Sequence, residues 1–154
     1  MSGSADTSSA AACEAAAVRL LARREHARAE LAAKLRQRDF DGEIVSEVLS
    51  DLEGRGLLSD ERFAEEYVRY RYNRGYGPLR IRAELRERGV DDGISDRWLD
   101  DPELDWAAAA RAARRKRFGD AGPESLPERQ REQRFLNYRG FTGDQIRAAL
   151  DDAS

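Results

Sequence analysis

Three passages of this 154-residue sequence follow one pattern: LRQRDF at residues 35–40, LRERGV at 85–90 and LNYRGF at 136–141. They begin at residues 35, 85 and 136, so the pattern returns after 50 and then 51 residues. In each passage a predicted helix, recognised by its spacing of apolar residues, ends at an Arg. A Gly or Asp follows, then one apolar residue, and then the next predicted helix begins. A repeat of this length is typical of a tandem array of small folding units.

The segments around these passages show helical spacing of apolar residues, without the alternation of a β-strand. A longer helical segment precedes each passage, at about 12–24, 60–74 and 104–118, and a shorter one follows it. The sequence predicts an all-α protein of nine helices: three tandem three-helix repeats, each similar to a helix-turn-helix unit, in an elongated and curved array. We expect a disordered N-terminal tail at residues 1–10 and repeats at 11–57, 58–101 and 102–154.

Several predicted helices begin at residues that favour a helix start. Asp41, Asp60 and Asp91 each stand where a side-chain oxygen can accept a hydrogen bond from an unpaired backbone amide. The passage TGDQ at 142–145 has the spacing of a capping box. Gly77-Pro78 places proline at the first helical position, where its missing N–H is tolerated.

The composition excludes several classes of protein. The chain has 27 Lys and Arg against 30 Asp and Glu, a net charge of −3, which favours helices joined by ion pairs. One cysteine, Cys13, and one histidine, His26, rule out an intramolecular disulfide and a Cys or His metal cluster. No stretch of about 18 apolar residues is present, and residues 1–12 lack the pattern of a secretory signal. We expect a monomeric cytoplasmic protein that is not an enzyme, has no cofactor or metal, and does not enter a membrane.

Positive and negative residues are concentrated in separate stretches. Residues 69–88 hold seven Arg and two Glu, and 111–117 hold five basic residues and no acid. Residues 91–105 hold seven acids and one Arg, and 41–53 hold five acids and no base. A surface of this kind suits a partner with its own charge pattern. The predicted partner contacts are Arg69, Arg71, Tyr72, Arg74, Arg80, Arg82, Arg86, Arg114, Arg115, Lys116 and Arg117.

Some of these residues allow two interpretations. Tyr67, Tyr70 and Tyr72 alternate with arginines, so they either stack on bases or partner side chains, or pack between helices with their hydroxyls at the edge. Arg82 and Arg86 are four residues apart and repel each other unless an anion is near. Glu84 and Arg88 have the spacing of an intrahelical ion pair.

The remaining distinctive residues favour structural roles. Cys13 fits a small core position, and His26 a packing or capping role. Trp98 and Trp106 lie close to the boundary between the second and third repeats, which we expect them to join. The loop at 119–127 contains two prolines, which indicates a mobile connection.

Four passages resemble the RecX family, regulators of the bacterial recombinase RecA: RREHARAEL at 23–31, GLLSDERFA at 56–64, RGYGPLRI at 74–81, and Gly140-Phe141 with Gln145-Ile146. The similarity extends from about residue 15 to 152. It implies a tandem three-helix protein without enzymatic activity that binds along the RecA–DNA filament. It further implies inhibition of RecA's ATPase and strand exchange, filament disassembly, and modulation of recombinational repair and the SOS response.

The leading hypothesis is therefore an inhibitory partner of the RecA filament, with the basic residues above at the contact. The alternative is a regulator that binds duplex DNA directly through its helix-turn-helix-like units. The slightly acidic net charge is unusual for a protein held mainly by phosphate contacts. We expect any direct binding to single- or double-stranded DNA to be weak.

Overall fold

The computed structural model describes residues 9–151, with 1–8 and 152–154 outside that range. Over this range the chain forms nine α-helices and no β-strand. They are α1 (Ala10–Arg23), α2 (Arg28–Gln37), α3 (Gly42–Gly54), α4 (Asp60–Asn73), α5 (Pro78–Glu87), α6 (Asp92–Leu99), α7 (Trp106–Phe118), α8 (Leu126–Arg139) and α9 (Gly143–Asp151). We call α1–α3 unit 1, α4–α6 unit 2 and α7–α9 unit 3. The prediction of three tandem three-helix repeats is confirmed. Most of the predicted tail, residues 1–8, lies outside the described residues.

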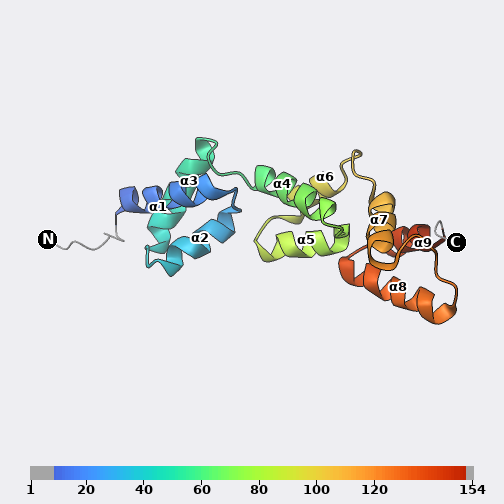
Figure 1. Ribbon diagram of the computed structural model, residues 1–154. Helices are drawn as coiled ribbons and strands as arrows, with labels where there is room; N and C mark the ends of the chain where they lie inside the picture. The colour runs from blue at the N-terminus through green and yellow to red at the C-terminus, as the bar shows by residue number, and fades with distance from the viewer. Residues whose placement is uncertain (1–8, 152–154) are drawn as a thin grey trace.

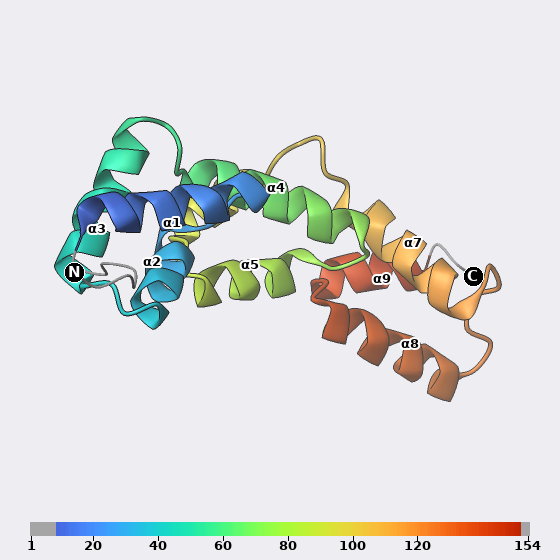
Figure 2. The same ribbon diagram turned by 60° about the vertical axis from the view of Figure 1, so that its left-hand side comes forward.

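The three units lie in a row, which makes the molecule elongated (Figure 1). Units 1 and 3 occupy opposite ends and unit 2 lies between them in both views (Figures 1 and 2). The row bends at unit 3, which turns away from the line of the first two units. Each unit encloses its own cluster of buried apolar residues, so the array has three small cores.

The repeated passages form the same turn at the end of the second helix of each unit. One or two residues beyond the helix, a residue has a left-handed backbone in all three, with φ of 69° at Asp39, 81° at Gly89 and 96° at Gly140. The next residue is apolar and buried, and its amide donates to the Leu carbonyl five residues back: Phe40 to Leu35, Val90 to Leu85 and Phe141 to Leu136. This is a Schellman ending, so the sequence repeat is a repeated way of ending a helix.

The helix starts follow the predictions in part. Asp91 accepts a hydrogen bond from the Gly93 amide, and Thr142 and Gln145 form the expected capping box. Asp41 occupies the N-cap position, but its side chain makes no capping hydrogen bond. The prediction for Asp60 is wrong, because Ser59 caps α4.

Polar contacts and one buried residue hold unit 1 to unit 2. Asp60 accepts a hydrogen bond from the Arg28 amide at 2.7 Å, which links the start of α2 to the start of α4. Arg62 of α4 forms an ion pair with Glu25 at 2.5 Å. Ala27, which precedes α2, is fully buried in the core of unit 2. The loop between α1 and α2 therefore belongs structurally to both units.

Unit 2 is joined to unit 3 through the backbone itself. The Gly77 amide donates to the Arg139 carbonyl at 2.7 Å, and the Leu79 amide donates to the Gly140 carbonyl at 2.9 Å. The amides at the start of α5 thus donate hydrogen bonds to carbonyls at the end of α8. Amides at a helix start and carbonyls at a helix end have no partner within their own helix. Gly77 fits because a Cβ there would lie 2.5 Å from the Gly140 carbonyl oxygen. The RGYGPLRI passage therefore makes a junction between units.

The tryptophans divide between two roles. Trp106 donates its indole N–H to the Leu99 carbonyl at 2.9 Å and packs against the cores of both unit 2 and unit 3, as expected. Trp98 instead donates to Glu61 of α4 and packs only against the core of unit 2. The expectation that Trp98 joins the two units is therefore wrong, because its partner lies within its own unit.

The cysteine and the histidine are both buried. Cys13 is fully buried in the core of unit 1, as predicted, and burial raises the pKa of its thiol. His26 is 1% exposed, and its Nδ1 lies 3.0 Å from the Arg24 carbonyl, which confirms a packing role. Burial lowers the pKa of His26, so its ring is neutral near neutral pH.

Replacing Gly77 with Ala tests the backbone junction. The added Cβ would force the α5 start away from Gly140, so we expect the free energy of unfolding to fall by about 1–3 kcal/mol. Gly54→Ala is the control, because a Cβ there meets nothing within 4 Å. That variant should keep its stability or gain up to about 1 kcal/mol. Urea unfolding followed by circular dichroism measures both, and equal stability of the two variants would contradict the junction.

Candidate binding groove

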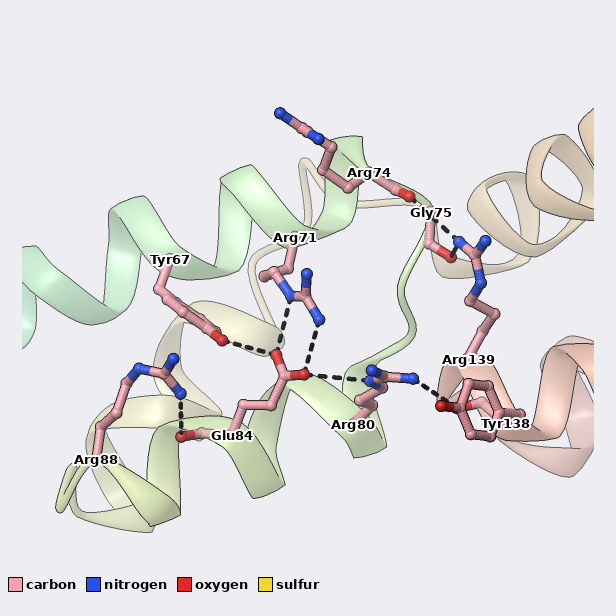
Figure 3. A network of polar contacts seen from close by, with 9 residues as sticks. All are labelled: Tyr67, Arg71, Arg74, Gly75, Arg80, Glu84, Arg88, Tyr138 and Arg139. Atoms are coloured by element: carbon pink, nitrogen blue, oxygen red, sulfur yellow. Dashed lines mark hydrogen bonds and ion pairs between the residues drawn. The ribbon is translucent and has the colours of Figure 1, made fainter.

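A single carboxylate, that of Glu84, binds two arginines and a tyrosine of unit 2 (Figure 3). It accepts hydrogen bonds from the Tyr67 hydroxyl at 2.7 Å and from Arg71 at 2.7 and 2.9 Å. Arg80 adds a third donor at 3.1 Å. Burial alone would raise the pKa of Glu84, but the hydrogen bonds from Arg71, Tyr67 and Arg80 outweigh it and hold that pKa below its usual value. The predicted Glu84–Arg88 pair is therefore absent: Arg88 donates to the Glu84 backbone carbonyl instead.

The Tyr76 ring is a second group on which arginines of this region converge, through cation–π contacts. Three guanidinium groups lie over it, with Arg71 at 3.7 Å and Arg80 and Arg139 each at 4.7 Å from the ring centroid. Arg80 also donates to the Tyr138 carbonyl, and Arg139 donates to the carbonyls of Arg74 and Gly75 (Figure 3). The contacts of Arg80 and Arg139 cross the junction between units 2 and 3, whereas Arg71 joins α4 to α5 within unit 2. Arg71 and Arg80 therefore both have structural roles.

The three tyrosines have different surroundings. Tyr67 packs between helices with its hydroxyl on Glu84, and burial together with that bond raises its pKa to about 12. Tyr72 forms an edge-on contact with Trp106, with ring centroids 5.0 Å apart. Tyr70 is 54% exposed and lies beneath the Arg74 guanidinium.

Three further candidate arginines pair with acids that follow in the sequence. Arg82 bonds Asp96 at 2.7 Å and Arg86 bonds Asp92 at 2.8 Å, so the expected repulsion between these two arginines is offset by carboxylates of α6. Arg69 bonds Asp101 at 3.1 Å and Glu103 at 3.4 Å. Their side chains stay partly exposed, with local charge close to balance.

The prediction that Arg114 contacts a partner is wrong, because its side chain is only 3% exposed. It forms an ion pair with the equally buried Glu132 of α8 at 2.6 Å and donates to the carbonyls of Gly119 and Ala121. Two carbonyls near the start of the 119–125 loop are therefore bonded to α7. Pro127, assigned to that loop, lies in the first turn of α8. Arg115 is exposed and faces Asp120.

The four remaining candidates, Tyr72, Arg74, Lys116 and Arg117, line one groove of about 530 Å³ between units 2 and 3. Its remaining lining residues are Asn73, Gly75, Ala108, Ala109, Ala112, Ala113, Phe135 and Arg139. The end of α4 and the end of α8 meet on one side of it, where Arg139 bonds the Arg74 and Gly75 carbonyls, and α7 forms its floor. In Figure 3 the Arg74 side chain points away from the Glu84 network. The two basic stretches of the sequence therefore meet at this groove.

Sequence reasoning missed the alanine floor and Arg139. The alanines form two adjacent rows on α7, Ala108–Ala112–Lys116 and Ala109–Ala113–Arg117, with four-residue spacing. That spacing was visible in the sequence, but nothing showed that this face of α7 stays partly uncovered. Arg139 stands out only from the junction, because its hydrogen-bond partners there lie more than 60 residues away. Within the described residues, no helix is long and apolar enough to cross a membrane.

The fold defines a tandem three-helix repeat protein. Sequence profiles of the first, second and third three-helix domains of RecX match residues 13–52, 59–99 and 103–150. The chain belongs to the RecX family.

Curated relatives and solved structures agree with this assignment. Regulatory protein RecX of Halorhodospira halophila is 55% identical over 134 residues, which cover 87% of this chain and 83% of that protein. Regulatory protein RecX of Pseudomonas entomophila is 46% identical over 84% of each chain. The crystal structure of RecX from Lactobacillus salivarius superposes with a TM-score of 0.80 at 23% identity, covering 94% of this chain and 96% of that one, and shows the same fold. A second crystal structure, of a regulatory protein RecX, gives a TM-score of 0.76 at 28% identity over 92% of this chain and 74% of that one.

Replacing Glu84 with Gln tests the organising carboxylate. Removing its charge should lower the free energy of unfolding by about 2–3 kcal/mol near neutral pH. Because the folded pKa lies below the usual 4.5, this stability is complete above pH 4.5 and is lost as the pH falls through the folded value. The gap between wild type and Glu84→Gln should therefore close in acid. Urea unfolding over a pH series measures it, and a gap independent of pH would contradict the assignment.

Replacing Arg114 with Met tests its structural role. Glu132 would be left buried without its partner, so we expect a loss of about 3–5 kcal/mol, much of it recovered in the double variant Arg114→Met with Glu132→Met. Lys116→Met on the exposed face of the same helix is the control and should change stability by less than about 0.5 kcal/mol. Thermal unfolding compares the three variants. Similar melting temperatures for Arg114→Met and Lys116→Met would restore Arg114 as a surface residue.

Proposed function

We propose that this protein is a negative regulator of RecA that binds the RecA–DNA filament in the cytoplasm. It inhibits the ATPase and strand-exchange activities of the filament and favours its disassembly, and so modulates recombinational repair and the SOS response. The observation that carries the proposal is membership of the RecX family across all three units, with relatives up to 55% identical.

The shape of the molecule supports a filament as the partner. A row of three units presents one long surface, whereas a globule of the same mass presents a short one (Figure 1). A helical filament offers the same contact on successive protomers, so an elongated protein can bind more than one of them at once. Each unit encloses its own core, so the array needs no second copy, and we propose that it acts as a monomer.

The distribution of charge supports a specific contact over a general attraction to polyanions. Most arginines of unit 2 are paired internally, and the net charge is −3. Three exposed cations, Arg74, Lys116 and Arg117, meet at the groove between units 2 and 3 although they come from separate stretches of the chain. The filament therefore contacts the cations of this groove, and direct binding to DNA is a weak secondary activity.

The first experiment titrates this protein into RecA hydrolysing ATP on single-stranded DNA at fixed salt. We expect inhibition at well below one copy per RecA protomer, because one bound copy affects a filament segment. No inhibition even at excess would overturn the proposed function. A duplex sequence bound far more tightly than random sequence would favour the alternative, a direct DNA-binding regulator.

A matched pair of variants tests whether the groove makes the contact. The groove variant carries Arg74→Glu, Lys116→Glu and Arg117→Glu. The control carries Arg19→Glu, Arg36→Glu and Arg38→Glu, three exposed cations of unit 1, and therefore has the same net charge. We expect the groove variant to need about tenfold more protein for half-inhibition, and the control to match wild type within about threefold. Equal inhibition by both variants would remove the groove from the contact.

A further inference from the structure

The floor of the groove has the shape of a helix-packing surface. Of the alanines on α7, Ala112 is exposed and Ala108 and Ala109 are partly exposed, while Ala113 is buried in the core of unit 3. Side chains this small allow another helix to approach at the short end of the usual interaxial range, about 8 Å. An apolar stripe laid on these methyl groups would be removed from water along its length.

The sides of the groove carry only positive charge. Arg74 and Arg139 stand on the side of α4 and α8, and Lys116 and Arg117 end the two alanine rows. No carboxylate is found among the described residues that line it. An occupant that fills the floor therefore meets cations along one side and at the end of the alanine rows, which favours carboxylates beside its apolar stripe.

The surroundings of the groove do not suit a continuous polyanion. At the Tyr72 end, the Tyr72 hydroxyl accepts a hydrogen bond from the Asp105 amide at 3.2 Å. Asp101 and Glu103 lie close by, against Arg69. A phosphate backbone that continued past Tyr72 would meet these acids. The aromatic rings that line the groove are also engaged edge-on inside the protein, Tyr72 with Trp106 and Phe135 with Phe118.

We propose that the groove binds an α-helix of the RecA protein itself, one with a narrow stripe of small apolar residues flanked by Asp or Glu. The inference rests on the proposed function and adds the kind of surface that is recognised. The apolar stripe packs on the alanine floor, and the flanking carboxylates pair with Arg74, Lys116 and Arg117. Protein, and not DNA, is then the main contact of units 2 and 3.

A photocrosslinker identifies the occupant directly. p-Benzoylphenylalanine replaces Asn73, the exposed last residue of α4 at the groove wall, or Gln37, the exposed last residue of α2 in unit 1, as control. Each full-length variant is irradiated with RecA filaments on oligo-dT, and the adducts are sequenced by mass spectrometry. We expect adducts at position 73 to map to an acidic helical segment of RecA, at about tenfold the yield of position 37. Adducts to DNA, adducts to a segment without carboxylates, or equal yields at the two positions would overturn the proposal.

Filling the floor gives an independent test that leaves every charge in place. Ala112→Trp occupies the groove, while Ala33→Trp places the same ring on exposed α2 as control. We expect Ala112→Trp to raise the Kd for the filament at least about tenfold, without change in its weak affinity for oligo-dT alone. An unchanged filament Kd would overturn the proposal. Inhibition of the RecA ATPase by the wild-type protein is measured in parallel, to separate the proposed function from the groove assignment. If the wild type inhibits but the groove tests fail, only the groove assignment is overturned. If the wild type does not inhibit, both proposals are overturned.

Discussion

The carboxylate of Glu84 is the point on which the middle of the molecule depends. It gathers Tyr67 and Arg71 of α4 and Arg80 of α5, and Arg80 then reaches the backbone of α8. The same arginines cover one ring, that of Tyr76, together with Arg139 from unit 3. The partly buried carboxylate thus offsets the repulsion between these arginines and allows them to pack at the boundary between units 2 and 3. Because these charges are used inside the protein, its external electrostatics cannot be deduced from the count of arginines.

The fold was predictable because its rules are local. A Schellman ending needs one left-handed residue and one apolar residue in a fixed order, and both are visible in the passages at 35–40, 85–90 and 136–141. Helical spacing then sets the number and order of the elements. The errors came where a residue's partner lies in another element. Asp60 bonds the Arg28 amide across a unit boundary instead of capping α4, and the Trp98 indole is held by Glu61.

The site was predictable only as a region. Sequence proximity grouped basic residues into two stretches, and the structure does bring these stretches together at the groove. Sequence proximity could not separate arginines with structural roles from arginines available on the surface, because the acids that pair with them are distant in the chain. Asp101 lies 32 positions from Arg69, and Glu132 lies 18 positions from Arg114. The groove also depends on side chains that carry no chemical signal. An alanine becomes informative only when the absence of a covering helix is known.

The division of the interior into three cores bears on how the protein reaches its native state. Each core draws its residues from a short, nearly continuous stretch of chain, so the loops that must close are short and their entropic cost is low. A chain of this topology has low contact order and is expected to fold rapidly. During synthesis, unit 1 can bury its apolar residues before unit 3 has left the ribosome. Ala27, which belongs to the core of unit 2, then remains exposed until the second unit is complete, so unit 1 supplies part of the surface on which its neighbour folds.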